Sequence, residues 1–413
     1  MMLHRALGEF AAQGGRIRVG IIGAGFMGRG IAAQVAGTPG MAVAFIADRV
    51  ERRATGAADH LVALGHPRPA TGGDGIGLLE THDIDLLVEA TTGIGAGLAH
   101  CRAAFRQHAH VVLMNAEVDL ACGDLLAREA AAAGVVVTSD AGDQPGVLAR
   151  LIDEMRLFGL RLVMAGNIKG FLDRHATAAG LHHEAAIRDL DPVQCCAYTD
   201  GTKLNIEMAL VANAFDLRPL CTGMQGPHAN TAAEALTRFR LTEIPQRGCV
   251  DYLLGAEPGG GVFAIGHSDD PSVQRYLRYL KLGDGPFYLL LRPHHLCHFE
   301  TPLAVAAAAL ERKPLLQPWA GRVTDVYAHA KRDLKAGAVI DVAIGGDLCH
   351  GLIEDVATAR QAGWVPLTLL EPEADAQPDE RARLRRSVAQ GAPLTWDDVE
   401  IPDTPLNRLL RPD

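Results

Sequence analysis

The sequence predicts an α/β protein in three parts: a doubly wound parallel sheet over residues 1–165, an α+β domain over 166–321, and a small β-rich domain over 322–413. Three observations support this prediction. A glycine-rich turn joins an apolar strand to a helix near the N-terminus. Strand and helix patterns then alternate up to about residue 165, whereas residues 322–413 contain short strands and many turns. Strands that alternate with helices over short connections are typical of a parallel sheet covered by helices.

The most specific motif is the glycine turn Gly23–Gly28, which has the pattern GxGxxG. It follows the apolar run Ile17–Ile22 and opens a helix, and a second apolar run, Met41–Ala47, ends on Asp48. Strand, glycine turn, helix, strand and acid follow one another in the order of a dinucleotide site. We therefore expect a Rossmann-type nucleotide site. The alternative is a glycine turn in an α/β domain without a ligand.

Each residue of the turn has an expected role in such a site. Gly23 permits the tight turn, Gly25 lets the backbone approach a pyrophosphate, and Gly28 lets the helix pack closely on the strand. The helix N-terminus, at Phe26 and Met27, offers N–H groups and a partial positive charge to the phosphates.

The residues after the second strand leave the choice of cofactor open. Asp48 would accept hydrogen bonds from an adenosine ribose, which favours NAD. Arg49, Arg52 and Arg53 follow at once and could pair with the 2′-phosphate of NADP, or form the solvated first turn of the next helix.

Other candidate ligand-binding residues follow the later strands of the predicted sheet. Ligands of doubly wound sheets bind beyond the carboxyl ends of the strands. Thr91, Thr92 and Gly93 follow the strand Asp85–Ala90, and Asn115 follows the strand His110–Met114. We expect all four residues to bind the cofactor, with Thr91, Thr92 and Gly93 on the side of the nicotinamide ribose. A helix N-cap turn would also explain Thr91–Gly93.

Composition excludes some classes of protein. A net charge of −10 argues against nucleic acid as a partner, because phosphate binding requires a basic surface. The uncharged apolar stretch Leu303–Leu310 is far shorter than a membrane span, and the N-terminus lacks a signal-peptide core. The eight cysteines include no CxxC pair, so reduced thiols are expected. We expect a cytoplasmic homo-oligomer that acts on a small molecule.

The densest polar cluster on a predicted helix lies in residues 199–214. Asp200, Lys203 and Glu207 have spacings of three and four, which place them on one helix face. A lysine between two carboxylates on an otherwise apolar helix would suit proton transfer or polarisation of a carbonyl. The alternative is a cap at Asp200 and an ordinary surface pair of Lys203 with Glu207.

Two further segments carry candidate substrate residues. Lys169 stands between Gly166 and Gly170 after a predicted strand, and with Arg174 and His175 it could bind an anionic substrate; the alternative is an exposed turn. Asp143 and Gln144 follow another strand end and start a helix. Asp143 as an N-cap, with Pro145 in the first turn, is the simpler explanation for that segment.

A histidine-rich segment, residues 292–301, contains His294, His295, His298 and Glu300. A zinc site needs two or three converging histidines, and an extended segment would place His294, His298 and Glu300 on one face. A single histidine in contact with the substrate is the alternative that we prefer.

Residues 322–413 contain a faint internal repeat. The segment KRDLKAGAVI (331–340) resembles RRSVAQGAPL (385–394) in its two basic residues, its glycine six positions after the first of them, and its aliphatic end. The repeat predicts two equivalent hairpin-like elements in one domain, unless the likeness arose by chance.

Together, IRVGIIGAGFMG, VEATTG, NAEVD, GDQP, TDGTKLNIEMALVANA, GVFAI, RPHHLCHFE and AKRDLKAG…GAPLTWDDVEIP resemble a family of homoserine-dehydrogenase-like NAD(P) proteins with a C-terminal SAF domain. Its best-understood branch is the deoxyxylulose-phosphate reductoisomerase-like (DRL) enzymes. The family has a tyrosine where His294 stands and a longer lysine-bearing loop where AGNIKG stands.

The resemblance implies an NADPH-dependent reductoisomerase acting on 1-deoxy-D-xylulose 5-phosphate, with Mg²⁺ or Mn²⁺ as a further cofactor. Lys203 would then be the acid or carbonyl polariser, Asp200 and Glu207 its partners, and Lys169 the ligand of the substrate anion. A plain dehydrogenase of a polyol, hydroxy acid or amino acid derivative is the second interpretation. A non-catalytic nucleotide sensor with a SAF domain is the third.

Overall fold

The computed structural model describes residues 3–340 and 342–411. The chain divides into two compact units: unit 1 is Met1–Gly146 with Leu296–Gln317, and unit 2 is Val147–His295 with Pro318–Asp413. We expected boundaries at residues 165 and 321. The division differs because Leu296–Gln317 packs on the first unit, and because the C-terminal residues share one compact unit with the central ones.

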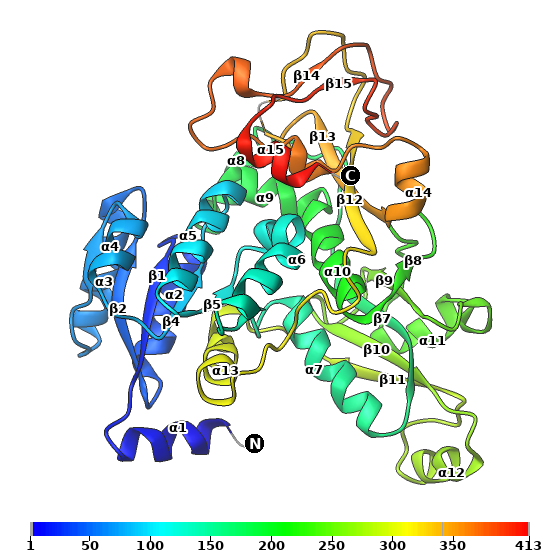
Figure 1. Cartoon of the computed structure of the whole chain (residues 1–413). Helices are drawn as coiled ribbons and strands as arrows, with labels where there is room; N and C mark the ends of the chain where they lie inside the picture. Colours follow the sequence, from blue (N-terminus) through cyan, green and yellow to red (C-terminus); the bar gives the residue numbers. More distant parts are fainter. Residues whose placement is uncertain (1–2, 341, 412–413) are drawn as a thin grey trace. The chain divides into compact units, whose positions relative to one another are not determined.

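Unit 1 is built on a six-stranded sheet in the order β3-β2-β1-β4-β5-β6, with every pair of neighbours parallel (Figure 1). This order confirms the predicted doubly wound sheet, in which the topological switch point lies between β1 and β4. The strands are β1 (Ile17–Ile22), β2 (Met41–Ala47), β3 (Ala70–Gly72), β4 (Leu86–Glu89), β5 (His110–Leu113) and β6 (Val137–Ser139).

The helices of unit 1 are α1 (Leu3–Ala12), α2 (Phe26–Gly37), α3 (Glu51–Ala63), α4 (Gly75–Thr81), α5 (Ile94–Arg106), α6 (Ala116–Ala132) and α13 (Thr301–Ala306). The pattern did not predict β3 or α4, because proline and glycine surround the three residues of β3. Asp74 marks the start of α4, since its side chain accepts hydrogen bonds from the N–H groups of Ile76 and Gly77.

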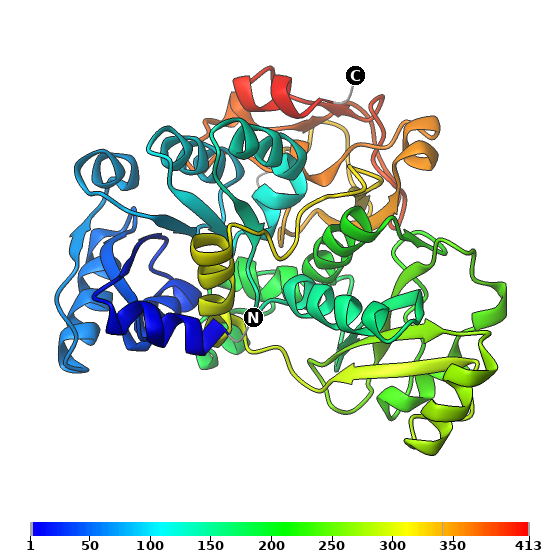
Figure 2. The same ribbon diagram turned by 60° about the horizontal axis from the view of Figure 1, so that its bottom comes forward.

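The segment Leu296–Gln317 belongs to the core of unit 1 although it lies far along the chain. Buried apolar residues of α13 join the core formed by β1, β4 and α2. Beyond this helix, the N–H of Leu315 donates to Oγ1 of Thr138, a residue of β6, at 2.9 Å. In Figure 1 and Figure 2 the yellow helix α13 lies among the blue and cyan elements.

Unit 2 contains a five-stranded sheet in the order β11-β10-β7-β9-β8. β10 is antiparallel to β7 and β11, whereas β9 is parallel to β7 and β8. The mixed sheet agrees with the predicted α+β character. The strands are β7 (Arg161–Lys169), β8 (Arg218–Pro219), β9 (Cys249–Leu254), β10 (Val262–His267) and β11 (Phe287–Arg292).

One helix of unit 2 is buried along its whole length, which the sequence pattern did not predict. Every residue from Thr202 to Ala214 of α10 (Thr202–Phe215) is buried. The other helices of four or more residues that the structure describes in this unit are α7 (Gln144–Leu157), whose first turn belongs to unit 1, α8 (His182–Ile187), α9 (Pro192–Thr199), α11 (Ala235–Arg238), α12 (Pro271–Tyr279), α14 (Val356–Gln361) and α15 (Pro405–Leu410).

The C-terminal part contains two antiparallel pairs: β12 (Thr324–Ala330) with β13 (Cys349–Asp355), and β14 (Arg383–Leu384) with β15 (Val399–Glu400). The predicted repeat is confirmed here. Leu334 and Val388, at equivalent positions of the two copies, exchange backbone hydrogen bonds of 2.8 and 3.0 Å.

Two more bonds obey the same symmetry. The N–H of Gly337 donates to Leu384 O at 2.8 Å, and the N–H of Gly391 donates to Ala330 O at 2.8 Å. Both glycines have positive φ, 84° and 79°. The two copies therefore form equivalent turns related by an approximate two-fold axis.

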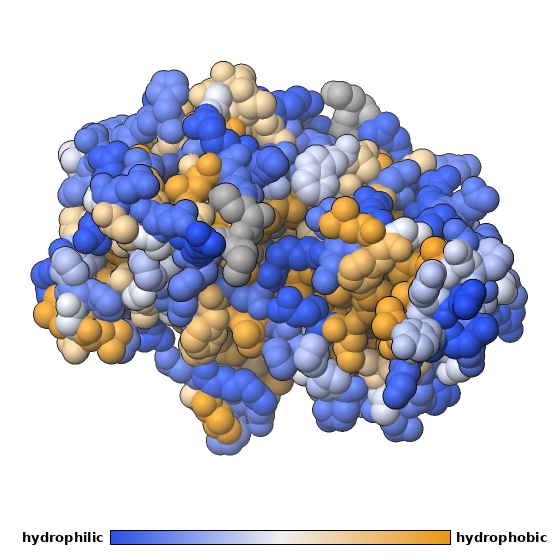
Figure 3. Space-filling model, turned by 90° about the horizontal axis from the view of Figure 1, so that it is seen from below, coloured by the Kyte–Doolittle hydropathy of each residue, from blue (hydrophilic) through white to orange (hydrophobic). Residues whose placement is uncertain are grey.

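The surface drawn in Figure 3 is mostly hydrophilic, with separate hydrophobic patches among the polar side chains. Across residues 3–340 and 342–411, no helix has the length and apolarity needed to cross a membrane. None of the eight cysteines, all of which lie within the described residues, forms a disulfide bond.

Candidate functional site

Two of the three glycines in the turn are required by close packing, as the motif predicted. Gly23 has φ +103°, and a Cβ atom there would lie 2.4 Å from the carbonyl oxygen of Ala90. A Cβ at Gly28 would lie 1.7 Å from the carbonyl oxygen of Gly23. Any side chain at Gly28 would therefore force α2 away from β1.

The third glycine faces open space. A Cβ at Gly25 would meet no atom within 4 Å, and Gly25 is the N-cap of α2. Phe26, which begins the helix, is 47% exposed, and Met27 is half-buried. An open glycine at a helix N-terminus is the arrangement that a dinucleotide pyrophosphate requires, so the residues present fit this cofactor.

Asp48 fixes the glycine turn from the end of β2. Its carboxylate accepts a hydrogen bond from the N–H of Ala24 at 2.8 Å and another from the N–H of Val50 at 2.8 Å. Arg49, Arg52 and Arg53 are exposed, the last two in the first turn of α3. These positions are compatible with contact to either a ribose or a 2′-phosphate.

A buried polar network that the sequence analysis missed joins the ends of β4 and β5. Glu89 is fully buried, and its Oε1 accepts from the Thr91 hydroxyl at 2.5 Å and contacts His100 Nδ1 at 3.3 Å. Asn115 Nδ2 donates to the carbonyl oxygen of Gly93 at 3.2 Å. The available signal was the unusual Glu89 at the end of an otherwise apolar strand.

The turn Thr91–Gly93 also has the simpler role that the sequence allowed. Gly93 is the N-cap of α5, and Thr92 is exposed. The side chain of Asn115 caps α6 by accepting from the N–H of Val118, which explains why α6 starts at Ala116.

Two buried carboxyl groups lie near β6 in the same unit, Asp119 in α6 and Asp140 directly after the strand. Asp140 is fully buried, and burial raises its pKa to about 7. Its Oδ1 accepts from the N–H of Gly142 at 2.7 Å, while Oδ2 is buried without a hydrogen-bond partner. Burial also raises the pKa of Asp119 to about 6, although the Ser139 hydroxyl opposes this by donating at 2.5 Å.

The predicted substrate residues Asp143 and Gln144 follow Asp140 in the sequence. α7 begins at Gln144, which is buried, with Pro145 in its first turn, and Asp143 is half-buried just before it. The helix start therefore agrees with the expected position of a cap at Asp143.

The histidine-rich segment is divided between the two units after His295. In unit 2, His294 is exposed and His295 Nδ1 lies 2.6 Å from the carbonyl oxygen of Gly260. In unit 1, the ring of His298 packs on α2, where a Cβ at Gly30 would lie 2.7 Å from it. Within residues 3–340 and 342–411, no three His, Cys, Asp or Glu side chains are arranged to hold a metal ion.

The predicted lysine and carboxylate cluster lies in unit 2. Lys203 is 8% exposed and Glu207 is 2% exposed, so they are not the ordinary surface pair considered as an alternative. The Lys203 ammonium lies 5.9 Å from the ring centroid of Tyr198. Burial of a charged lysine in an apolar helix requires compensation, which makes this residue unusual.

Lys169 belongs to the same cluster. It is the last residue of β7, so it is not in an exposed turn. Lys169 Nζ lies 3.6 Å from Glu207 Oε2, and Asn167 Nδ2 donates to the same oxygen at 3.1 Å. Asn167, absent from the sequence-based set, thus joins Lys169 and Glu207.

Asp200 has a different partner from the one expected. It ends α9 and accepts from the N–H of Thr202 at 2.8 Å, but its ion pair is with Lys331 Nζ at 2.8 Å. Both side chains of this pair are buried. The expectation that Asp200 shares the helix face of Lys203 is wrong, because Gly201 separates Asp200 from the start of α10.

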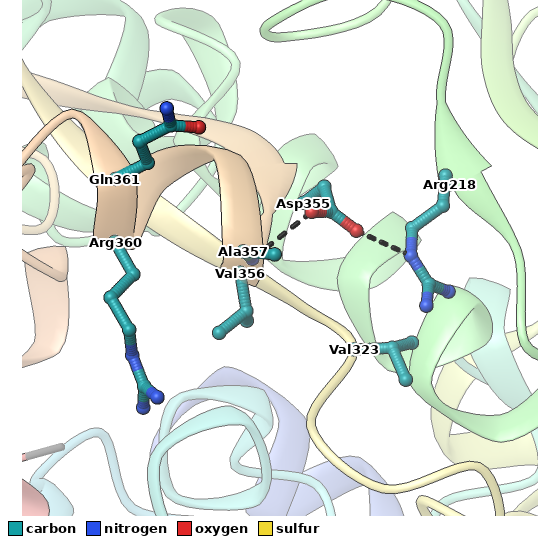
Figure 4. Close-up of a pocket in the computed structure, with 7 residues that line it drawn as sticks. All are labelled: Arg218, Val323, Asp355, Val356, Ala357, Arg360 and Gln361. Carbon is teal, nitrogen blue, oxygen red and sulfur yellow. Dashed lines mark hydrogen bonds and ion pairs between the residues drawn. The ribbon is translucent and has the colours of Figure 1, made fainter. Parts of the chain in front are cut away.

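Arg174 and His175 lie near the C-terminal strands. Arg174 is exposed, and its charge opposes the rise that burial causes in the pKa of Tyr252. His175 Nδ1 lies 2.9 Å from the carbonyl oxygen of Lys331. No residue of the predicted site lines the pocket in Figure 4, in which Arg218 Nε donates to Asp355 Oδ2 at 2.6 Å and which Arg360 also lines.

Comparisons with solved structures give remote similarity. UDP-N-acetylglucosamine 3-dehydrogenase from Acidithiobacillus ferrooxidans is 15% identical over 74% of this chain and 93% of that one, with a TM-score of 0.42. Myo-inositol dehydrogenase from Lactobacillus casei, solved with NAD(H) and myo-inositol, is 17% identical over 69% and 68%, with a TM-score of 0.34.

An oxidoreductase from Agrobacterium radiobacter, solved with NAD⁺, L-tartaric acid and magnesium, is 16% identical with a TM-score of 0.31. The match covers 45% of this chain and 54% of that one, so it spans about half the length of that enzyme. The chain matches no curated protein.

A family model matches the middle of the chain. It is described as the catalytic domain of oxidoreductase DRL, and it matches residues 142–301. The matched segment contains Lys169, Asp200, Lys203 and Glu207, which the sequence analysis selected as catalytic. This part of the chain is therefore similar to an oxidoreductase catalytic domain, in agreement with the resemblance inferred from the sequence.

Proposed function

We propose that this chain is an NAD(P)H-dependent oxidoreductase that interconverts a carbonyl and a hydroxyl group on a small hydroxylated or phosphorylated molecule. The similarity of residues 142–301 to an oxidoreductase catalytic domain carries this proposal. Gly25, the open glycine at the N-terminus of α2, supports the cofactor class independently. It lies in unit 1 and outside the matched residues 142–301.

The dinucleotide would be held by backbone groups of unit 1. The N–H groups at Gly25, Phe26 and Met27 would bind the pyrophosphate. Asp48 would accept from the ribose of NAD, whereas Arg49 would pair with the 2′-phosphate of NADP. When bound, this cofactor supplies or accepts the hydride.

Lys203 would serve as the acid. Reduction of a ketone adds a hydride to the carbonyl carbon and a proton to its oxygen, and the Lys203 ammonium would donate that proton. Lys169 would bind an anionic group of the substrate, and Glu207 would hold Lys169 through the contact of 3.6 Å. Asp143, Gln144, Arg174, His294 and His295 are our further candidates for substrate contact.

Reductoisomerisation is a second candidate, which the DRL match favours. The carbon skeleton of a hydroxyketone phosphate such as 1-deoxy-D-xylulose 5-phosphate would rearrange first, and the resulting aldehyde would then be reduced. A requirement for Mg²⁺ or Mn²⁺ belongs to this candidate, with ligand atoms contributed by the substrate. A nucleotide sensor is less well supported, because binding alone needs no buried lysine at position 203.

The test is an assay of NADH and NADPH oxidation with 1-deoxy-D-xylulose 5-phosphate and a panel of hydroxyketones, with and without Mg²⁺, and of the reverse reaction with polyols. We expect turnover with at least one substrate and a loss of at least a hundredfold in Lys203→Met, with cofactor affinity unchanged. Lys335→Met, which changes an exposed lysine, is the matched control.

Two results would contradict the proposal. One is the absence of turnover in either direction with every compound, although the protein binds a nicotinamide nucleotide. The other is turnover in Lys203→Met equal to that of the control, which would remove Lys203 from the reaction.

A further inference from the structure

The buried helix α10 carries Lys203 and Glu207 on one face, and a second polar face of the same helix binds the C-terminal strands. The N–H of Gly351 donates to Thr202 Oγ1 at 3.0 Å, and the N–H of Ile353 donates to Asn205 Oδ1 at 2.9 Å. Farther along, the N–H of Thr324 donates to Asn213 Oδ1 at 2.8 Å. These helix positions are three and eight residues apart, which places their side chains on one face.

Lys203 and Glu207 lie on a different side of the helix, about a third of a turn from Thr202. The strands β12 and β13 therefore fix the position of α10 without occupying the face that carries Lys203. Backbone groups of these strands donate most of these bonds, so the register of the helix against the strands is set by polar contacts.

Lys331 completes this attachment at the N-terminal end of α10. It follows β12 directly, and its ammonium is buried. Lys331 Nζ donates to Asp200 Oδ2 at 2.8 Å and to the carbonyl oxygens of Ala176 at 2.8 Å and Gly346 at 2.7 Å, with Cys196 Sγ at 3.3 Å. An ammonium group has three N–H donors, so these acceptors satisfy it completely.

The internal repeat supplies an independent observation. Lys331 is the first residue of one copy, and the equivalent residue of the other copy is Arg385. The two copies have equivalent turns and backbone hydrogen bonds, yet Lys331 is buried and Arg385 is exposed. The fold of the turn therefore does not require a buried cation at this position, and Lys331 has a role that Arg385 lacks.

We propose that Lys331 is a positioning residue: through Asp200 it fixes the turn at which α10 begins, and thereby the place of the Lys203 ammonium. This inference rests on the proposed function for the role of Lys203. Asp200 bonds the N–H of Thr202, the first residue of α10, so the ion pair acts on the helix directly. Lys203 is the next residue along the chain.

The test compares Lys331→Met, the charge-neutral double variant Asp200→Asn/Lys331→Met, and the control Arg385→Met, all in the full chain. Removing one partner alone leaves a buried unpaired charge, so the single variant could fail to fold, whereas the double variant avoids this. Backbone hydrogen exchange of the peptide 200–207 and the rate of amine labelling of Lys203 report its position without a substrate. Turnover and the KM for NAD(P)H report its role.

We expect exchange in this peptide to become at least tenfold faster in the double variant, with an altered rate of Lys203 labelling, a lower kcat and an unchanged KM for the cofactor. Arg385→Met should match the wild type in every measurement. Unchanged exchange and labelling in the folded double variant would overturn the proposal. Altered exchange and labelling with normal kcat would support positioning by Lys331 and would refute the catalytic role of Lys203.

Discussion

The glycine turn provides a sharp comparison, because Gly25 and Gly28 are identical residues three positions apart with opposite surroundings. We predict that Gly25→Ala weakens binding of NADH or NADPH but leaves the stability of the protein nearly unchanged. The added methyl group would meet no protein atom within 4 Å, and φ at this position is −70°, which alanine adopts without strain. Alanine is a poorer N-cap than glycine, and this should cost at most about 1 kcal/mol.

The loss of affinity follows from the phosphate contact. A hydrogen bond to a charged group contributes about 1.5–3 kcal/mol. Losing one such bond corresponds to roughly tenfold to hundredfold weaker binding, since each 1.4 kcal/mol changes the affinity about tenfold. The methyl group would occupy the space through which the pyrophosphate approaches the backbone.

Gly28→Ala should show the opposite behaviour. Alanine is normally better than glycine inside a helix by about 1 kcal/mol, but here its Cβ would lie 1.7 Å from the carbonyl oxygen of Gly23. The overlap forces α2 away from β1, and we expect a net loss of roughly 1–3 kcal/mol in the free energy of unfolding, as for other overpacked sites.

Fluorescence titration with NADH and NADPH measures the first effect, and urea unfolding measures the second. The assignment of the glycine turn as a nucleotide site is refuted if Gly25→Ala binds both nucleotides with wild-type affinity. It is also refuted, for the packing part, if Gly28→Ala unfolds at the same urea concentration as the wild type.

Three further predictions concern ionisable groups. The pKa of Asp140 is raised to about 7 against an unfolded value of 3.8, so the folded state binds a proton more tightly than the unfolded state. The free energy of unfolding therefore falls as the pH rises through this range. In urea melts, Asp140→Asn should be more stable than the wild type at pH 8 by up to roughly 4 kcal/mol, and this difference should vanish below pH 4. His350 shows the reverse, since burial lowers its pKa to about 3 and the unfolded state therefore binds the proton first. The free energy of unfolding should decline by about 1.4 kcal/mol per pH unit as the pH falls below about 6.5. His350→Leu should flatten this decline, whereas the control His183→Leu, at an exposed site, should not. Asp48→Asn removes the charge that would repel a 2′-phosphate while keeping one acceptor for the N–H of Ala24, so the ratio of NADP to NAD affinity should rise; a constant ratio in parallel titrations would show that Asp48 does not select the cofactor.

The burial of α10 depends on contacts between its polar side chains and distant strands. Its second polar face is occupied by Thr202, Asn205 and Asn213, residues that in an isolated sequence look like ordinary polar positions of a helix. Their partners lie more than a hundred residues away, on β12 and β13. Side-chain capping of strand backbone groups therefore explains why a helix with so many polar residues is buried.

The sequence by itself determined most of the parallel sheet of unit 1. The alternation of strands and helices apart from β3 and α4, the two tight positions Gly23 and Gly28, and the equivalence of the two C-terminal turns follow from local patterns. Turn conformation and strand periodicity depend on neighbouring residues. The start of α6 does not follow from periodicity alone, since it depends on whether the Asn115 side chain turns back to cap the helix.

Only the tertiary structure decided the partners of the charged residues. Asp200 was expected beside Lys203 because of their spacing, but it pairs with Lys331, and Glu207 contacts Lys169 from a neighbouring strand. Spacing along a helix fixes which side chains share a face, whereas burial favours whichever opposite charge the fold brings nearest. That choice depends on contacts between residues far apart in the chain, and no local pattern encodes it.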